Sequence, residues 1–156
     1  SQSHIHTLKE IMRIHGPLDK SKSFLILEDD FTFHDDFDDE RVRTALTTAP
    51  DYHVILFSGY ILKKGTGPNE YLDKCVCAQT TSGYLVRGDY IPTLLKNFEE
   101  GLKQLQITFV PMSYAIDMYW KRLQHSRWYI MRPLVGYQRE SYSDCECKIV
   151  NPKKIY

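Results

Sequence analysis

The sequence has no long apolar run and no excess of charge of either sign. None of its apolar stretches approaches the roughly 20 residues that a membrane-spanning helix requires. Lysine and arginine together number 20, and aspartate and glutamate also number 20, so the formal net charge is zero. Surfaces that bind nucleic acid or anionic membranes are usually strongly basic. We therefore expect no nucleic-acid partner, no transmembrane segment and a small or neutral binding partner.

Signal-peptide features, internal repeats and low-complexity tracts are also missing. The first residues, Ser-Gln-Ser-His-Ile-His, contain neither a basic n-region nor an apolar h-region. On this ground we expect a soluble chain and favour a cytoplasmic location. With 156 residues, of which 42% are hydrophobic, the chain can build one ordinary core but not two. We predict a single domain spanning residues 1–156.

The four cysteines do not show the usual spacing of a zinc site. They form two Cys-x-Cys pairs, Cys75 with Cys77 and Cys145 with Cys147, whereas repeated Cys-x-x-Cys is the more specific signature. Residues two apart in a strand share a face, so either pair could still offer two thiolates to zinc. We favour reduced, packed thiols. A disulfide between the pairs requires an oxidising compartment, which the sequence does not specify.

Residues 24–31 carry the strongest chemical signal, because four apolar residues run directly into three carboxylates, Glu28, Asp29 and Asp30. The apolar run predicts a strand buried on both faces. Ligand sites of open α/β sheets lie at the carboxyl ends of strands. Adjacent carboxylates repel one another unless a cation balances them, so the motif favours a divalent metal. The alternative is an exposed strand end in an acid-rich region.

The remaining patterns alternate between helices and strands, which favours an α/β fold with a layered sheet. Helices are predicted at residues 4–15, where Gly16-Pro17 ends the helix, and at 35–49, 91–102 and after Ser113, which we expect to cap its helix. Strands are predicted at 53–58, 75–79, 83–87 and 128–137, the last broken by Pro133, with a strand or turn at 107–111.

Two segments are predicted to be irregular. Residues 59–70 contain several glycines and a proline and read as a loop, in which Tyr60, Lys63 and Lys64 either contact an acceptor or phosphates or lie on a flexible surface. The polar segment from about residue 138 onward is expected to be an irregular tail. The aromatic residues Tyr119, Trp120, Trp128 and Tyr129 are expected in the core rather than as platforms for sugars.

Several motifs in order resemble glycosyltransferase family 25, which includes lipopolysaccharide-biosynthesis and collagen galactosyltransferases. The resemblance covers residues 3–144, and its most specific part is the Glu-Asp-Asp strand. It is carried by Ser3-His4, Leu25-Ile26-Leu27-Glu28-Asp29-Asp30, Thr81-Ser82-Gly83-Tyr84-Leu85-Val86, Ile116-Asp117, Arg132-Pro133-Leu134-Val135 and Ser143-Asp144.

The resemblance implies a GT-A fold, with a mixed sheet flanked by helices. It also implies a nucleotide-sugar donor such as UDP-galactose or UDP-glucose, Mn²⁺ or Mg²⁺ as the cofactor, and transfer with inversion. The hydroxyl acceptor would belong to a glycan, a lipid-linked saccharide or a protein. Family members carry a further strand and helix upstream of the position that corresponds to residue 1. The usual Ser-Asp-Ile is here Ser143-Asp144-Cys145, which leaves the role of Asp144 open.

We assign Asp30 to the metal, and Glu28 to the metal or the donor ribose, because the outer residues of an extended tripeptide share one side. The middle residue, Asp29, is expected to orient a neighbouring group around the donor. Thr81, Ser82 and Gly83 are expected to form a tight corner beside the donor, where glycine permits close backbone approach, although turns use the same residues everywhere. His4 is expected to be buried and hydrogen-bonded, with a position facing the donor as the alternative.

Inversion by single displacement needs a base for the proton of the acceptor hydroxyl. Asp117 is the candidate, because the resemblance places an Asp after an apolar residue here and a helix N-terminus keeps a carboxylate ionised. Spacing alone equally supports an Asp that only complements the helix dipole.

Two other classes of function remain open. Residues 27–32 superficially resemble the Asp-x-Asp-x-Thr strand end of haloacid-dehalogenase phosphatases, but Glu28 occupies the position of the nucleophile and is one methylene too long. The other class is a catalytically silent carbohydrate-binding or interaction domain. Metal-dependent binding of a UDP-sugar distinguishes the transferase from both.

Overall fold

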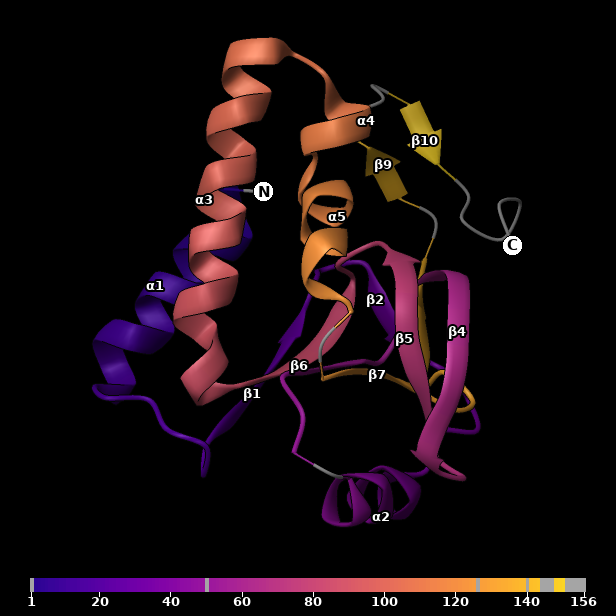
Figure 1. Ribbon diagram of the computed structural model, residues 1–156. Coiled ribbons are helices and arrows are strands. Elements are labelled where there is room, and N and C mark those ends of the chain that lie inside the picture. Colours follow the sequence, from indigo (N-terminus) through magenta and orange to yellow (C-terminus); the bar gives the residue numbers. More distant parts are fainter. Residues whose placement is uncertain (1, 50, 126, 140, 144–147, 151–156) are drawn as a thin grey trace.

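A six-stranded mixed sheet forms the centre of the structure (Figure 1). The computed structural model describes residues 2–49, 51–125, 127–139, 141–143 and 148–150. Strands β3 and β7 are parallel, and every other neighbouring pair in the sheet is antiparallel. In spatial order the strands are β1 (Ser23–Leu27), β6 (Gly83–Arg87), β3 (Val54–Leu56), β7 (Trp128–Met131), β5 (Leu72–Gln79) and β4 (Tyr60–Asn69).

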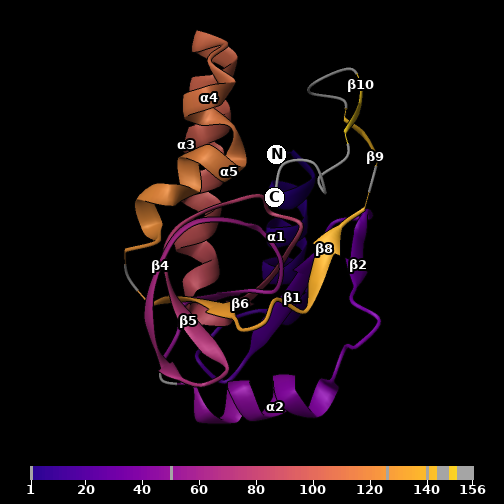
Figure 2. The ribbon, with the colours of Figure 1, turned by 90° about the vertical axis from the view of Figure 1, so that its right-hand side faces the viewer.

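Helices cover the sheet on both faces, and each face has its own apolar cluster (Figures 1 and 2). The larger cluster lies under α1 (Gln2–His15) and α3 (Ile91–Thr108), together with the short helix α5 (Ile116–Tyr119) and the 3-10 turns η1 (Gly88–Tyr90) and η2 (Trp120–Leu123). The short helix α4 (Pro111–Tyr114) packs against α3 and α5. The smaller cluster lies on the opposite face, under α2 (Asp39–Thr48). Successive side chains of a strand point to opposite faces of the sheet, so they enter the two clusters alternately.

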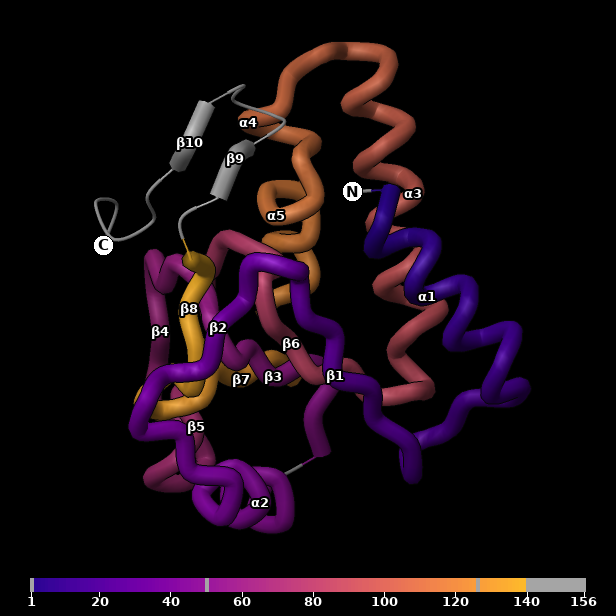
Figure 3. Tube along the Cα trace, turned by 180° about the vertical axis from the view of Figure 1, so that it is seen from behind, coloured from indigo at the N-terminus to yellow at the C-terminus, as the bar shows by residue number. Residues whose placement is uncertain are grey.

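Two small antiparallel pairs lie outside the main sheet. Strand β2 (Phe31–Phe33) pairs with β8 (Gly136–Gln138), and Figure 3 shows them side by side. Strand β9 (Ser141–Ser143) pairs with β10 (Lys148–Val150). The β2–β8 pair matters for the candidate site, because it returns the chain beside the acidic residues that follow β1.

The predicted class, a mixed α/β sheet flanked by helices, is confirmed, and so are several individual elements. Helix α1 ends before Gly16, whose φ of 65° suits a glycine at this position. Strand β6 spans the predicted 83–87, and α3 contains the predicted helix but continues to residue 108. Trp120 and Trp128 are fully buried in the larger cluster, as expected for core aromatic residues. No helix in the described ranges combines the length and the apolar character that crossing a bilayer requires.

The prediction that the acidic strand is buried on both faces is wrong. In β1, Ile26 is buried at 6% exposure, whereas Leu25 and Leu27 are 45% and 39% exposed. Among the described strands β1 pairs only with β6, so it forms an edge of the sheet and one of its faces is open. An uninterrupted run of apolar residues indicates a strand, but only the neighbouring elements decide how many of its faces are covered.

Residues predicted to be irregular form strands instead. Residues 60–69 lie in β4, which pairs with β5 through several shifts in register. These shifts let a strand accommodate glycines and a proline that local propensity assigns to a loop. The predicted irregular tail contains the β9–β10 pair, while Asp144, Cys145 and Cys147 lie outside the described residues.

The helix expected after Ser113 is divided in two. Ser113 lies inside α4 and does not cap a helix, because the non-helical residue Ala115 ends α4 and is the N-cap of α5. Asp117 nevertheless lies in the first turn of α5, as predicted. The predicted helix at 35–49 begins later, at Asp39, and its first turn is capped by the side chain of Asp38.

Candidate functional site at the end of strand β1

The three carboxylates after β1 lie in a turn and not in an extended chain. The backbone N–H of Phe31 donates to the carbonyl oxygen of Glu28 at 3.1 Å, which places Asp29 and Asp30 at the two corner positions. The prediction that Glu28 and Asp30 share one side of an extended tripeptide is therefore wrong. The turn sends the first and third carboxylates to different neighbours, one toward α1 and β6 and the other toward β8.

Glu28 is fixed by residues from two distant segments. Its Oε1 atom lies 2.8 Å from His4 Nε2 of α1 and accepts a hydrogen bond of 2.7 Å from the hydroxyl of Thr81. Its backbone N–H donates to the carbonyl oxygen of Ser82 at 2.8 Å. Its side chain is 27% exposed, and no hydrogen bond within the described residues reaches Oε2. One carboxylate oxygen is thus held by the protein, and the other is available to a ligand.

These contacts keep Glu28 ionised. Burial is the largest influence on the pKa of this carboxyl and raises it, but the hydrogen bonds from His4 and Thr81 outweigh burial. The net result is a pKa below the usual 4.5. Hydrogen bonds donated to a carboxylate favour its charged form. Glu28 therefore presents a negative charge at neutral pH in a largely desolvated position.

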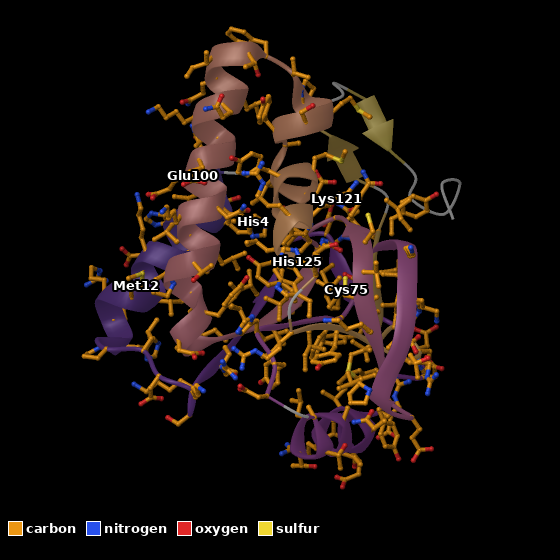
Figure 4. The ribbon with its side chains drawn as sticks, viewed as in Figure 1. His4, Met12, Cys75, Glu100, Lys121 and His125 are labelled. Atoms are coloured by element: carbon orange, nitrogen blue, oxygen red, sulfur yellow. The ribbon has the colours of Figure 1, made fainter. Side chains whose placement is uncertain are left out.

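His4 connects Glu28 to the core. Its Nδ1 atom lies 3.0 Å from the hydroxyl of Tyr84, and the residue is only 5% exposed, which confirms that it is buried and hydrogen-bonded. Figure 4 shows His4 toward the middle of the molecule, whereas Met12 of the same helix lies at its periphery. Burial raises the pKa of Tyr84, so its hydroxyl stays protonated and can donate to Nδ1. Because Glu28 can only accept, this assigns the ring proton of His4 to Nε2.

The segment 80–82, between β5 and β6, also contacts Asp117. The backbone N–H of Thr80 donates to Asp117 Oδ2 at 3.4 Å, so Asp117 and Glu28 bind successive residues of one corner. Thr80 has a φ of 68°, an uncommon conformation for a residue with a branched side chain. The tertiary structure therefore brings the predicted base and the predicted metal ligand to the same short segment, although they are far apart in sequence.

Ser82 and Gly83 are buried in this corner and act mainly through their backbone. The Ser82 hydroxyl lies 2.6 Å from that of Ser58, and its carbonyl oxygen accepts from Glu28. The carbonyl oxygen of Gly83 accepts from Phe57 N at 2.9 Å. A Cβ atom on Gly83 would lie 2.6 Å from Cε2 of the Phe31 ring, so glycine is required for close packing. The group that the structure shows close to Gly83 is the Phe31 ring, whereas the sequence predicted the donor at this position.

Asp30 and Asp29 differ in their surroundings. Asp30 is 9% exposed, and its Oδ2 accepts a hydrogen bond of 2.8 Å from the Gln138 side chain on β8. Its backbone carbonyl accepts from Arg139 N at 2.9 Å. Asp29 is exposed at the corner of the turn, and its backbone carbonyl accepts from the Arg139 guanidinium at 2.7 Å. Gln138 of β8 and the following residue, Arg139, therefore hold the Asp29-Asp30 turn through three hydrogen bonds.

The donor atoms of this turn suit a hard cation. Its side chains offer only carboxylate oxygens, which Mg²⁺ and Mn²⁺ prefer over the nitrogen and sulfur ligands typical of zinc sites. Within the described residues, no three His, Cys, Asp or Glu side chains form a group able to hold a metal on their own. Mg²⁺ usually takes only one or two carboxylates, together with water and substrate phosphates. Glu28 and Asp30 each offer one carboxylate of this kind, and the turn directs them to different neighbours.

The described cysteines, Cys75 and Cys77, are free. Cys75 is fully buried, and burial raises the pKa of its thiol to about 12. A thiol of such a high pKa remains protonated and packs as a small apolar residue.

Three residues at the site were not assigned a role from sequence. Tyr84 belongs to the Thr-Ser-Gly-Tyr motif but carries no local sign of its contact with His4. Ser58 and Gln138 gave no signal, because each reaches the site only through pairing between segments far apart in sequence. A run of small polar residues, such as 80–82, indicates a corner but not the residue that the corner contacts.

Comparisons with known proteins do not assign the chain to a family. The chain matches no protein-family model, and no curated protein matches it at a significant level of similarity. The motif resemblance to glycosyltransferase family 25 therefore remains a hypothesis, which the site has to support by its own chemistry.

Proposed function

We propose that this protein is a metal-dependent glycosyltransferase that moves a hexose, galactose or glucose, from a nucleotide-diphosphate sugar to a hydroxyl acceptor with inversion. The observation that carries the proposal is the convergence of Glu28 and Asp117 on the corner at Thr80 and Thr81, next to the Asp29-Asp30 turn. An inverting transfer needs two separate groups of this kind, one for the charge of the leaving group and one for the acceptor proton.

Glu28 and Asp30 are the residues that would hold Mn²⁺ or Mg²⁺. The bound metal would neutralise the charge that develops on the departing diphosphate. His4 and Thr81 orient the Glu28 carboxylate and keep it ionised, so its free oxygen is ready for a cation. Gln138 orients Asp30 in the same way from β8. The backbone of Ser82 and Gly83 sets the position of the corner against the turn.

Asp117 acts as the base in this proposal. Its Oδ2 is held by the backbone N–H of Thr80, and no hydrogen bond within the described residues reaches Oδ1. Oδ1 takes the proton of the acceptor hydroxyl as the acceptor oxygen attacks the anomeric carbon. The bond from that carbon to the phosphate oxygen breaks, and the electron pair leaves with the nucleoside diphosphate. Attack from the side opposite the leaving group inverts the configuration.

Thermal melting with Mn²⁺ and a panel of UDP-sugars tests the proposal. A compound that binds only the folded state at 100 times its dissociation constant stabilises it by about 2.7 kcal/mol. We expect a Mn²⁺-dependent shift for UDP-galactose or UDP-glucose, loss of that shift in Asp30→Asn, and retention in the control Asp36→Asn, which changes an exposed acid beyond the turn. The proposal fails if the wild-type chain shows no metal-dependent shift with any UDP-sugar.

The melting experiment, combined with an assay of phosphomonoester hydrolysis, separates the two alternative classes. A haloacid-dehalogenase-like phosphatase would hydrolyse a phosphomonoester in the presence of Mg²⁺ without binding a UDP-sugar. A silent carbohydrate-binding domain would show neither activity nor a metal-dependent shift.

A further inference from the structure

A second cluster of charged residues lies toward the opposite edge of the sheet from β1, in a pocket lined by residues of β4, β5 and β7 and of the segment that follows β7. Its volume is about 280 Å³, and its lining includes Asp73 of β5. Its charged lining residues are Lys63, Lys64 and Arg132, and its apolar lining residues are Ile61, Leu62, Ile130, Met131, Pro133 and Leu134. Of these residues, sequence analysis placed the two lysines in a loop, and it named Arg132, Pro133 and Leu134 only as part of the motif resemblance.

The pocket has an excess of positive charge. The Asp73 side chain is only 7% exposed and pairs with two cations, Lys64 Nζ at 2.5 Å and Arg132 Nη1 at 3.2 Å. Lys63 lines the same pocket and makes no ion pair with the described residues. Three positive side chains against one carboxylate leave an excess of two positive charges. An anion entering the pocket would meet cations that Asp73 already holds in place.

The irregular pairing of β4 explains why two successive lysines line one pocket. Successive residues of a regular strand point to opposite faces. The β4–β5 pairing shifts in register between Ile61 and Lys63 and again between Lys63 and Lys64. Such irregularities redirect side chains and are common beside functional sites. The Arg132 side chain is also held in position, because its Nε donates to the backbone carbonyl oxygen of Glu70 at 3.0 Å.

Both walls of the pocket continue into the candidate site. On one wall, Ile61 lies three residues after Ser58 in the sequence, and the Ser58 hydroxyl is hydrogen-bonded to that of Ser82. Leu134 precedes Val135, whose N–H donates to Phe57 at 3.0 Å, and the chain then reaches Gln138, the partner of Asp30. The pocket is therefore linked by short, hydrogen-bonded segments to both sides of the site.

We propose that this pocket binds the acidic group of a sugar-sized molecule, a phosphate or carboxylate attached to a single ring. Ligand pockets usually have volumes of roughly 300–1,000 Å³, so this one suits a small molecule. Its apolar walls can pack against the face of a sugar ring, while Lys63 and Lys64 donate to the oxyanion. The choice of a sugar as the ring rests on the proposed glycosyltransferase function, in which the pocket would hold an acidic acceptor.

The test measures binding without metal or donor, so its outcome is separate from that of the transferase assay. Glucose 6-phosphate, glucuronate, neutral glucose and UDP are titrated into the full chain by NMR. We expect both acids to bind more tightly than glucose. Lys63→Gln should weaken their binding about tenfold, which corresponds to about 1.4 kcal/mol. The matched control, Lys103→Gln, removes an exposed lysine of α3 outside the pocket and should change nothing.

Three results would overturn the proposal. The first is equal binding of glucose and glucose 6-phosphate. The second is an identical response of Lys63→Gln and Lys103→Gln to both acids. The third is a loss of UDP binding alone in Lys63→Gln, which would assign the pocket to the diphosphate of the donor. Binding of the acids by a chain with no transferase activity would leave the pocket in place and refute only the proposed function.

Discussion

His4 Nε2 lies 2.8 Å from Glu28 Oε1, and this contact joins the first helix to the carboxyl end of the edge strand β1. Thr81 donates to the same oxygen, and Tyr84 completes the network behind His4. The arrangement holds a half-buried carboxylate ionised, and no hydrogen bond from the described residues occupies its second oxygen. Stability and the proposed function therefore depend on the same few hydrogen bonds.

Replacing His4 tests the structural part of this network. His4→Ala removes one partner of the Glu28 carboxylate and leaves the buried Tyr84 hydroxyl without its acceptor. Hydrogen bonds to charged groups contribute about 1.5–3 kcal/mol, so we expect the free energy of unfolding in urea to fall by about that amount. His6→Ala, an exposed substitution on the same helix, is the control. Equal stability of the two variants would show that the contact contributes nothing.

The pH dependence of stability follows from the lowered pKa of Glu28. A carboxyl with a lower pKa in the folded state than in the unfolded state stabilises the fold above its unfolded pKa. That contribution is lost as the pH falls from the usual value of 4.5 through the folded pKa. We expect urea titrations to show stability declining across this range in the wild-type chain and less steeply in Glu28→Gln. The control Glu100→Gln, at the surface of α3, should keep the wild-type slope; identical slopes in all three proteins would contradict the prediction.

The substitution Asp117→Asn tests whether Asp117 contributes to turnover rather than to stability. The amide oxygen of asparagine can still accept from Thr80 N, so we expect an unchanged melting temperature and unchanged donor binding. Loss of a general base typically lowers turnover by about 10² to 10⁴. Steady-state assays with the donor identified by the melting screen would measure this, with Asp35→Asn as an exposed control. Full turnover in Asp117→Asn would leave Asp117 with only its structural contact.

Gly83→Ala tests the packing of the corner against the acidic turn. The added Cβ would lie 2.6 Å from Phe31 Cε2 and 3.2 Å from Ser58 Oγ. Overpacking of this kind costs about 1–3 kcal/mol, which chemical denaturation would detect. Gly65→Ala is a suitable control, because its nearest contact, at 3.6 Å, is ordinary. If the clash is the cause, Phe31→Leu should recover part of the loss in the double mutant.

Much of the local structure could be predicted because it depends on the spacing of apolar residues and on the glycine and proline residues that end helices. Apolar spacing along α1 and α3 indicates their buried faces, and Gly16 marks the end of the first helix. Local signals failed where pairing with a distant strand overrode them. The glycines and proline of residues 59–70 suggest a loop, yet pairing with β5 makes that segment a strand. Similarly, the extended shape assigned to residues 28–30 became a turn because Phe31 pairs with β8.

For the candidate site, the sequence by itself determined its chemistry: three consecutive carboxylates after an apolar strand, and a further aspartate at a helix start. Only the tertiary structure decided which of these groups act together. It brought His4 and Thr81 to Glu28, Asp117 to Thr80, and Lys64 and Arg132 to Asp73. The physical reason is that residue type fixes charge and ligand preference locally, whereas burial and hydrogen-bond partners come from segments that only the folded sheet places side by side.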